Sequence, residues 1–334
     1  MRAAQLIGPR TIEIGDVREP NPGYGEALVR VLGVGVCGTD SKIYDGGIPV
    51  AYPRVMGHEI VGEVEMAPSE SKHLVGRRVL VDPGITCGRC WQCRSSRGNI
   101  CTGGWLLGRD RDGGLRELME VSVANVHPLP PELDDPSAPV LQVLATCIHA
   151  QRLAPPKPGD SVVIIGLGVS GLLHLQLAKM HGAGPIVVAT RNAAKLALAR
   201  QLGADETVQL VPDLDPAVIT DAVDGGAELV IECVGAVSML AMAVRIARIG
   251  GRVLAYGISA ESDGSFPYYD LYYKEIGLIG ARSANARDFP AAIEAAASGV
   301  VRLEPLVSRH IPLAGLADAL GKRDPSGLKT IIDV

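Results

Sequence analysis

Four cysteines within fifteen residues constrain the fold of this chain more than any other feature. They lie in the stretch Cys87-Gly-Arg-Cys90-Trp-Gln-Cys93-Arg-Ser-Ser-Arg-Gly-Asn-Ile-Cys101, with the spacing C-x2-C-x2-C-x7-C. Four thiolates this close can converge on one zinc ion in a closed tetrahedral site, which leaves no coordination position for a substrate. Disulfides are the alternative, but the chain has seven cysteines and its start lacks the apolar core of a signal peptide. We therefore predict a structural zinc lobe over residues 87–101.

Length and composition favour a folded protein of two domains. The chain has 334 residues, of which 47% are hydrophobic and 21% charged, which suits two packed cores and excludes a disordered chain. Its net charge of −5 weighs against a nucleic-acid-binding surface. The most apolar window, residues 161–178, is interrupted by glycines and by His174 and Gln176, so we expect no membrane helix there. We expect a cytoplasmic protein without nucleic-acid or membrane partners.

The order of the predicted elements changes along the chain. Short strands separated by glycine and proline fill the first part, at residues 1–7, 11–17, 26–36, 60–66 and 77–81. From residue 160, strands alternate with helices. The strands are expected at 161–165, 185–190, 206–210, 227–232 and 252–257, and the helices at 169–181, 193–202, 213–222 and 237–248. Such alternation builds a parallel sheet with helices on both faces.

These elements predict an α/β protein with a β-rich catalytic domain and a doubly wound, Rossmann-type cofactor domain. The cofactor domain is expected to cover residues 146–283. A last helix (289–298) and strand (328–333) are expected to return to the first part of the chain. The catalytic domain would therefore combine residues 1–145 with 284–334.

A glycine-rich turn marks the dinucleotide site. The stretch Gly166-Leu-Gly168-Val169-Ser170-Gly171 follows a predicted strand and opens a predicted helix, which is the context that makes G-x-G-x-x-G informative. The first glycine allows the tight turn, the second lets the backbone approach the pyrophosphate, and the third lets helix and strand pack closely. The phosphates would then lie at the helix N-terminus. We assign all of these residues except Leu167 to cofactor binding.

The next strand favours NADP(H) over NAD(H). An acidic residue near its end would hold the ribose 2′-hydroxyl of NAD, but no Asp or Glu occurs between Asp160 and Asp205. The segment contains instead Thr190, Arg191, Asn192 and Lys195. A hydroxyl and a guanidinium can bind a 2′-phosphate, and they remove the repulsion that a carboxylate would exert. We predict a preference for NADP(H), with NAD(H) as the possible alternative.

Two short motifs upstream predict the chemical site. Cys37 and His58, in Cys37-Gly-Thr39-Asp40 and Gly57-His58-Glu59, can bind a zinc ion that keeps one position open for substrate. Such an ion polarises an alcohol or carbonyl oxygen. Thr39 could carry the alcohol proton outward, and Asp40 could orient His58. Taken singly, Cys37 could also be a core residue and His58 an ordinary loop histidine.

These motifs together resemble the zinc-dependent medium-chain alcohol and polyol dehydrogenases. The resemblance rests on Cys37-Gly-Thr-Asp, Gly57-His-Glu-Ile-Val-Gly62, the cysteine quartet and Gly166-x-Gly-x-x-Gly171, and it covers essentially the whole chain. It implies a GroES-like catalytic domain, a Rossmann domain, and one catalytic and one structural zinc ion per chain. As activity it implies reversible hydride transfer between a nicotinamide cofactor and a small-molecule alcohol or carbonyl compound.

The resemblance also implies further site residues. Glu59 would be an exchangeable ligand of the catalytic zinc, whereas Gly257, Ile258 and Arg282 fall in segments that flank the nicotinamide half of the cofactor in such enzymes. The subunits of the family associate near a segment that reads Tyr268-Tyr-Asp-Leu-Tyr-Tyr273 here. We therefore expect a homodimer or homotetramer.

One residue near the metal departs from the family pattern. Polyol- and threonine-type relatives carry a glutamate that approaches the zinc, and this chain has Gln142 in its place. Cys147 is a rival ligand, but five residues on a helix turn through about 140°, so the two side chains cannot face one ion. Alignment with the family's sequence pattern places Gln142 at the ligand position. We therefore interpret Cys147, like Cys233, as a buried thiol. Since an amide oxygen holds zinc more weakly than a carboxylate, we expect a labile catalytic zinc.

The residues leave two other functions open. One is a zinc-independent quinone or enoyl reductase of the same superfamily, which would need neither Cys37, His58 nor the quartet. The other is a non-catalytic NADPH-sensing protein. The substrate is expected to contact the loops at 44–55 and 105–111, where Tyr44, Trp105 and Arg109 are candidates, but these residues do not decide between a secondary alcohol, a polyol and a sugar.

Overall fold

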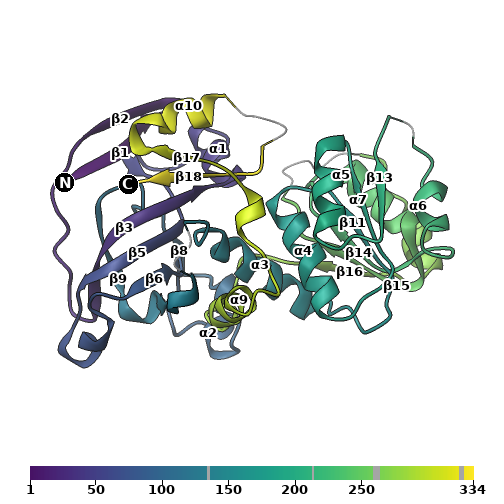
Figure 1. Cartoon of the computed structure of the whole chain (residues 1–334), viewed down its shortest axis with the longest axis horizontal. Coiled ribbons are helices and arrows are strands. Elements are labelled where there is room, and N and C mark those ends of the chain that lie inside the picture. Colours follow the sequence, from purple (N-terminus) through teal and green to yellow (C-terminus); the bar gives the residue numbers. More distant parts are fainter. Residues whose placement is uncertain (134–135, 213, 259–263, 323–326) are drawn as a thin grey trace. The chain divides into compact units, whose positions relative to one another are not determined.

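The computed structural model describes residues 1–133, 136–212, 214–258, 264–322 and 327–334, and it divides into two compact units (Figure 1). The first unit combines Met1–Ala145 with Asn285–Val334, and the second is Thr146–Ala284. The boundary falls within helix α3 (Val140–Leu153). Within the described residues, no helix is long and apolar enough to span a membrane.

The first unit is built on a mostly antiparallel sheet of seven strands. Its order is β10-β6-β5-β3-β18-β17, with β9 also paired to β3. The strands are β3 (Glu26–Val36), β5 (Glu59–Met66), β6 (Arg78–Val81), β9 (Leu118–Ser122), β10 (Val126–Pro128), β17 (Val307–Pro312) and β18 (Lys329–Asp333). Alternate residues such as Val34, Ile60 and Ile332 are fully buried in the core on one face. The last strand of the chain is therefore a neighbour of β3, near the centre of this sheet.

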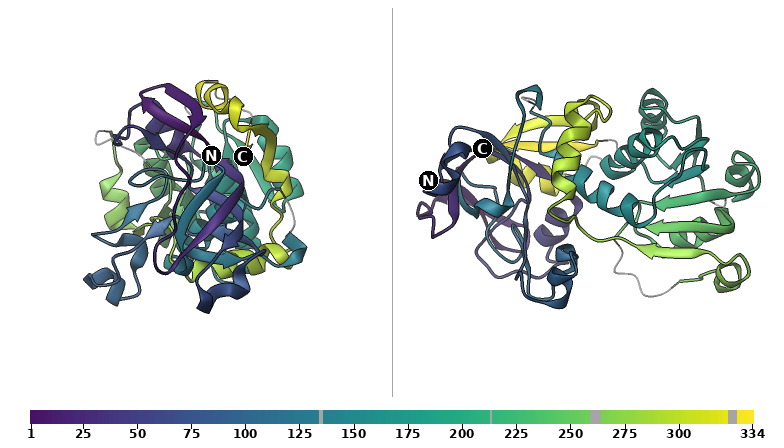
Figure 2. Two further views of the ribbon diagram at one scale, coloured as in Figure 1. Left: turned by 90° about the vertical axis from the view of Figure 1, so that its left-hand side faces the viewer. Right: turned by 90° about the horizontal axis from the view of Figure 1, so that it is seen from below.

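Smaller elements complete the first unit. A three-stranded sheet has the order β2 (Thr11–Asp16), β1 (Arg2–Gly8), β4 (Arg54–Val55), and a two-stranded sheet pairs β7 (Gly84–Ile85) with β8 (Trp105–Leu106). Besides the start of α3, the α-helices in the described residues of this unit are α1 (Gly38–Tyr44), α2 (Trp91–Arg94), α9 (Asp288–Ala297) and α10 (Leu316–Gly321). Two further views show these elements around the main sheet (Figure 2).

The second unit contains a parallel sheet of six strands, in the order β13-β12-β11-β14-β15-β16. The strands are β11 (Val162–Ile165), β12 (Ile186–Thr190), β13 (Glu206–Gln209), β14 (Ala227–Glu232), β15 (Ala247–Ala255) and β16 (Gly277–Gly280). The helices are α4 (Val169–Met180), α5 (Ala193–Gln201), α6 (Ala217–Asp221), α7 (Val237–Ile246) and α8 (Tyr268–Tyr273). The chain moves outward from β11 to β13 and then, from β14, in the opposite direction. Right-handed crossovers therefore place α4 and α5 on one face and α7 on the other.

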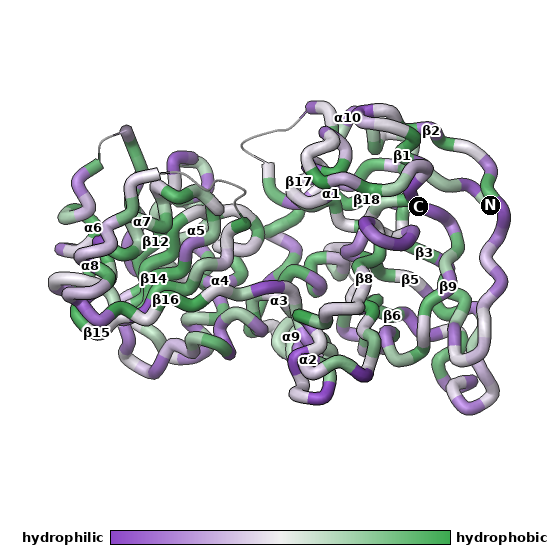
Figure 3. Tube along the Cα trace, turned by 180° about the vertical axis from the view of Figure 1, so that it is seen from behind, coloured by the Kyte–Doolittle hydropathy of each residue, from purple (hydrophilic) through white to green (hydrophobic). Residues whose placement is uncertain are grey.

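The central strands of this sheet are hydrophobic along their whole length, as covered parallel strands must be (Figure 3). Val163, Ile165, Val187 and Val230 are fully buried. The predicted fold class, a GroES-like β-rich domain plus a Rossmann-type parallel sheet, is confirmed.

Some boundaries differ from the sequence expectation. The helix expected at 213–222 is the shorter α6, which begins after Pro216, and residue 213 lies outside the described residues. The strand expected at 252–257 begins earlier, at Ala247, where the sequence predicts the end of a helix. Ala247 and Arg252–Ala255 pair with β14, and the register shifts between them, so residues 248–251 form an irregular stretch within the strand.

The buried carboxyl of Asp82, just after β6, makes stability depend on pH. Asp82 is 7% exposed, and desolvation raises the pKa of its carboxyl to about 7. The hydrogen bond from the Gly84 backbone acts in the opposite direction, whereas the nearby charge of Asp288 raises the pKa further. A raised carboxyl pKa means that the folded chain binds the proton more tightly than the unfolded chain does. The cost of burial is therefore absent below about pH 4 and fully present above about pH 7.

Replacing Asp82 by asparagine should therefore stabilise the protein only at the higher pH. The pKa difference sets an upper limit of about 4 kcal/mol, and because the buried amide keeps part of the desolvation cost, we expect about 2 kcal/mol near pH 8 and little near pH 4. Urea unfolding of both proteins at the two pH values measures this difference. An equal gain at both values would contradict it.

Candidate active site

The two upstream motifs meet at neighbouring strands of the first unit. Cys37 follows β3, and His58 and Glu59 stand at the start of β5, which pairs antiparallel with β3 so that Gly35 lies opposite Glu59. Cys37 Sγ lies 3.0 Å from His58 Nε2. One potential ligand atom from each of Cys37, His58 and Glu59 lies within 4.8 Å of the other two. Strand pairing thus brings together two motifs that are 21 residues apart.

The first turn of α1 fixes the Cys37 thiol. Cys37 is the N-cap of this helix, and its Sγ accepts a hydrogen bond from Thr39 N at 3.2 Å. In return, Asp40 Oδ2 accepts a hydrogen bond from Cys37 N at 3.0 Å, which completes a capping box.

Asp40 lies behind the imidazole of His58. Its Oδ1 is 3.4 Å from His58 Nδ1, while Nε2 faces Cys37. Both side chains are buried. Burial alone would lower the pKa of His58, but the charges of Cys37 and Asp40 raise it well above its ordinary value. Burial likewise opposes ionisation of Asp40, but the charge of His58, hydrogen bonds with His58 and Cys37 and the charge of Lys329 together lower the pKa of Asp40. The carboxylate lies beside the ring, and its role in orienting His58 stays a prediction.

The chemistry of this cluster fits a zinc ion. A thiolate, an imidazole nitrogen and a carboxylate are donors that zinc commonly takes in proteins. Glu59 is 1% exposed, and its Oε2 has no hydrogen bond to any described residue. Beside a thiol and an imidazole, this oxygen is suited to a cation, and the ammonium of Lys329 already lies 2.7 Å from it.

The two residues that competed for the fourth ligand position have different surroundings. Cys147 is fully buried, as predicted, and its Sγ lies 3.7 Å from both the Ser170 carbonyl and the Tyr256 hydroxyl. Gln142 lies in the first turn of α3 and is 7% exposed. Its role as a ligand stays a prediction. Cys233, which was expected to be fully buried, is partly exposed.

The cysteine quartet converges as its spacing predicted. The sulfurs of Cys87, Cys90, Cys93 and Cys101 all lie within 4.8 Å of one another, and none is in a disulfide. Hydrogen bonds from the backbone N–H groups of Cys93 and Thr102 lower the pKa of Cys90 to about 5. Desolvation instead raises the pKa of Cys93 to about 11. A divalent cation would favour the thiolate form of all four residues, which is the donor set of a structural zinc site.

The glycine-rich loop of the second unit has the geometry that a dinucleotide needs. Gly166 follows β11 with φ +95°, which favours glycine, and a Cβ on Gly171 would lie 1.9 Å from the Gly166 carbonyl oxygen. Gly168 is the N-cap of α4, and a Cβ there would meet nothing within 4 Å. The first and third glycines are therefore required by the fold, whereas the second leaves open space at a helix N-terminus.

The predicted 2′-phosphate residues lie at the carboxyl end of β12. Thr190 ends the strand, Arg191 is exposed, and Asn192 caps α5 by accepting a hydrogen bond from Ala194 N. The next acidic residue, Asp205, accepts a hydrogen bond from Ile186 N at the opposite end of β12. No carboxylate of the 160–205 segment therefore lies at this strand end.

The other predicted cofactor residues follow the remaining strands of the same sheet. Gly257 and Ile258 come after β15, and Arg282 comes after β16. Ligands of such sheets bind at the carboxyl ends of the strands, beside the reversal of strand order, which here falls between β11 and β14. Lys195, on α5, is partly buried.

Sequence reasoning missed Glu232 at the end of β14. Its carboxylate is 2% exposed and accepts hydrogen bonds from Val234 N and Gly235 N at 2.7 and 2.8 Å. It therefore shapes the loop after β14, whose Gly235 backbone is so close to Gly257 that a Cβ on Gly257 would lie 2.1 Å from it. The sequence did offer a signal for this role, because Glu232 is an acidic residue at the end of an apolar strand and Gly235 follows it closely.

The first of the two loops assigned to the substrate is held by Asp112, the residue that follows the second loop. Arg54 Nη1 lies 2.8 Å from Asp112 Oδ1, and this oxygen also accepts a hydrogen bond from Val55 N. Trp105 is 48% exposed and stacks with the Arg111 guanidinium 4.3 Å from its ring centre. Tyr44 does not belong to such a surface, because the last turn of α1 buries it in the core of the first unit. Arg109 is paired with Asp110.

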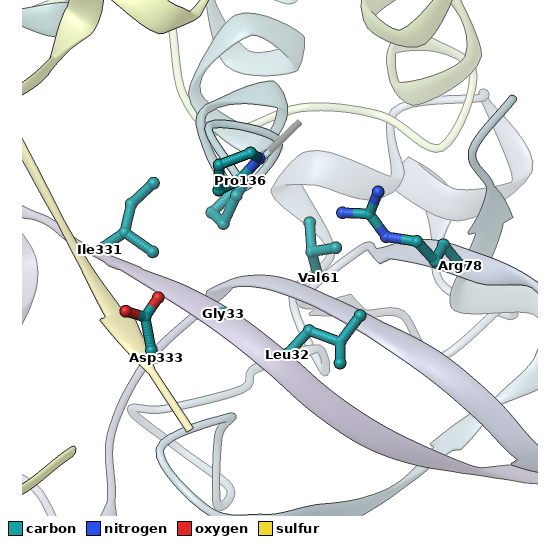
Figure 4. Close-up of a pocket in the computed structure, with 8 residues that line it drawn as sticks. Leu32, Gly33, Val61, Arg78, Pro136, Ile331 and Asp333 are labelled. Carbon is teal, nitrogen blue, oxygen red and sulfur yellow. The ribbon is translucent and has the colours of Figure 1, made fainter. Parts of the chain in front are cut away.

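A separate pocket lies on the main sheet of the first unit (Figure 4). It has a volume of about 280 Å³ and is lined by Leu32, Gly33, Val61, Arg78, Pro136, Pro139, Ile331 and Asp333. Gly33, Val61 and Ile331 stand two residues along their strands from Gly35, Glu59 and Lys329, and therefore on the same face. The pocket does not include Cys37, His58 or Glu59.

Comparison with known proteins gives consistent matches over the whole chain. Residues 23–131 match the alcohol dehydrogenase GroES-like domain, and residues 169–298 match the zinc-binding dehydrogenase family. The 2-dehydro-3-deoxy-L-galactonate 5-dehydrogenase of Pseudoalteromonas atlantica is 32% identical over 100% of this chain and 98% of its own length.

Two solved structures illustrate the likeness. A zinc-binding dehydrogenase from Sinorhizobium meliloti bound to NADP has a TM-score of 0.91 and 31% identity, covering 100% of this chain and 99% of that one. An alcohol dehydrogenase from Escherichia coli complexed with NADH has a TM-score of 0.93 and 27% identity, with the same coverage. The chain therefore belongs to the zinc-dependent medium-chain dehydrogenase family.

Proposed function

We propose that this protein is a zinc-dependent dehydrogenase that transfers a hydride between NADP(H) and an alcohol/carbonyl pair. The observation that carries the proposal is the cluster of Cys37, His58 and Glu59, with a buried carboxylate oxygen that has no hydrogen bond to any described residue, in the same chain as the open glycine loop. The family membership supports the dehydrogenase activity in general. The chain's own residues support the zinc and the NADP preference.

The roles of the side chains follow from their positions. Cys37 and His58 would hold the zinc, with Glu59 or Gln142 completing its ligands, and the bound ion would act as a Lewis acid for the substrate oxygen. Asp40 keeps His58 Nε2 turned toward Cys37. Thr39, whose backbone already binds the Cys37 sulfur, would accept the alcohol proton through its hydroxyl and pass it outward.

We propose a polyol or sugar acid as substrate, with other secondary alcohols as the alternative. The relative from Pseudoalteromonas atlantica is named for a sugar acid, and the loops at 44–55 and 105–111 carry polar side chains such as Arg54 and Arg109. Assays with a panel of polyols, sugar acids, simple secondary alcohols and ketones, each with both cofactors, test this through the absorbance of the reduced nicotinamide. Turnover only of quinones or enones would instead support a zinc-independent reductase.

The two metal sites should differ in how firmly they hold zinc. Dialysis against a mild chelator should leave about one zinc ion per chain and abolish activity, because the four thiolates of the quartet retain their ion while the Cys37 site has only two strong ligands. Metal analysis before and after dialysis measures this, and added zinc should restore activity. Retention of two ions would contradict it.

We also propose a homodimer or homotetramer that associates through α8. Its four tyrosines, Tyr268, Tyr269, Tyr272 and Tyr273, are each more than 60% exposed, and Tyr269 and Tyr273 stack on each other. Exposed tyrosines of this density are typical of interfaces. Sedimentation of the protein and of a variant with Tyr268 and Tyr272 replaced by serine tests the proposal.

A further inference from the structure

We infer that Lys329, on the last strand of the chain, competes with the catalytic metal for the carboxylate of Glu59 and thereby sets how firmly that metal is held. The inference rests on the proposed zinc site at Cys37 and His58. It makes Lys329 a positioning residue, because it would act through Glu59 rather than on the substrate.

The ammonium and the carboxylate form a buried ion pair. Lys329 Nζ lies 2.7 Å from both oxygens of Glu59, and the two side chains are 5% and 1% exposed. Lys329 Nζ also donates a hydrogen bond to the carbonyl oxygen of Val36 at 3.1 Å, one residue before Cys37. The positive charge is thus fixed beside the cluster of Cys37, His58 and Glu59. It also helps to lower the pKa of Asp40.

Strand pairing holds this arrangement in place. On one side of β3, Thr330 of β18 lies opposite Val36, and on the other side Glu59 of β5 lies opposite Gly35. Lys329 and Glu59 therefore reach toward each other across β3. A Cβ on residue 35 would lie 2.1 Å from Glu59 Oε2, so only glycine leaves room for the carboxylate there. The pair depends on three adjacent strands rather than on flexible loops.

The two oxygens of Glu59 are not equivalent. The geometry of a hydrogen bond from Lys329 is satisfied at Oε1, whereas Oε2 has no hydrogen bond to any described residue. The lysine therefore holds Oε1 by a hydrogen bond, and at Oε2 its charge would compete with a metal ion, because Nζ lies 2.7 Å from that oxygen as well. Since Lys329 already compensates the negative charge, a metal at Cys37 and His58 need not bind the carboxylate to keep it stable in the interior.

The charge at position 329 should therefore control metal release, and two substitutions should act in opposite directions. Lys329→Met removes the charge, which leaves the metal as the cation beside Glu59, so the carboxylate should bind it permanently. Lys329→Arg keeps the charge and offers a planar fork that can bind both oxygens, which should draw Glu59 away from the metal.

The experiment follows zinc release from the holoenzyme to a colorimetric chelator, 4-(2-pyridylazo)resorcinol. We expect release of the first zinc to slow about tenfold or more in Lys329→Met and to quicken several-fold in Lys329→Arg, since one charge-assisted contact is worth about a factor of ten. The zinc of the cysteine quartet should leave at the same rate in all proteins, which makes it an internal control. Cobalt in place of the first zinc should show a changed visible spectrum in Lys329→Met.

A double variant tests whether Lys329 acts through Glu59. In the Glu59→Gln background, the change Lys329→Met should leave the release rate unaltered, because a neutral amide does not need the charge. The double variant leaves no unpaired buried charge, because both members of the ion pair are neutral, so it stays informative if Lys329→Met alone fails to fold. Equal release rates in the wild type and Lys329→Arg, or the same slowing by Lys329→Met with and without Glu59, would overturn the inference.

A failure of the proposed function can be distinguished experimentally from a failure of this inference. If the wild-type protein binds only one zinc ion and Cys37→Ser does not change that number, there is no metal at Cys37 and the proposed function itself is wrong. If two ions bind but substitutions at position 329 do not change the rate of zinc release, the zinc site is supported and only the role of Lys329 is refuted.

Discussion

Replacing Cys37 by serine should lower kcat/KM by about 10³-fold or more while leaving the protein folded. The proposed zinc loses its thiolate ligand, and metal polarisation of the substrate oxygen is worth several kcal/mol. The fold should survive because Cys37 caps α1 by accepting a hydrogen bond from Thr39 N, and a serine hydroxyl can accept the same bond. Activity with the best alcohol substrate, zinc content and thermal unfolding measure the three parts of this expectation.

Cys90→Ser is the matched control, because it makes the same chemical change in the quartet. It should leave the reacting groups in place and instead lower the stability of the lobe at 87–101, where metal binding contributes folding free energy. Metal analysis should find that each variant loses a different ion. If Cys37→Ser keeps more than about a tenth of the activity, the Lewis-acid role of the metal is wrong and a zinc-independent reductase is favoured.

The fold could be predicted from local patterns because the features that specify it are local. The glycine loop at 166–171 requires a strand before it and a helix after it, and hydrophobic runs such as Val162–Ile165 indicate covered parallel strands. The four cysteines can converge because only short loops separate them along the chain. The sequence did not predict the short length of helix α6 or the early start of β15, because tertiary packing outweighs weak local preferences there.

The site was predicted where it consists of motifs and missed where it depends on strand register. Cys37, His58 and Asp40 are brought together as expected. The contact between Glu59 and Lys329 joins residues 270 positions apart, and only the order β5-β3-β18 makes them neighbours. A lysine at the start of an apolar strand gave no sign that its ammonium is buried. Tyr44 was placed near the substrate because it lies in a loop-like stretch, but the helix turns it into the core.

Replacing Arg191 by aspartate should reverse the cofactor preference. At the carboxyl end of β12, a carboxylate would accept a hydrogen bond from the ribose 2′-hydroxyl of NAD and repel the 2′-phosphate of NADP. Losing a charge-assisted contact and adding a repulsion together change the binding free energy by about 3–4 kcal/mol, so the ratio of kcat/KM for NADP over NAD should fall by about 10²–10³-fold.

Arg200→Asp is the matched control for this substitution. It makes the same charge change on the same unit, but Arg200 lies at the far end of α5, where its guanidinium contacts the Thr207 hydroxyl. Its cofactor ratio should stay close to that of the wild type, since exposed charges beyond about 10 Å are largely screened. Fluorescence titrations with NADPH and NADH should show that the change in Arg191→Asp lies in binding. A wild-type preference for NAD, or an unchanged ratio in Arg191→Asp, would contradict the assignment of this strand end to the 2′-phosphate.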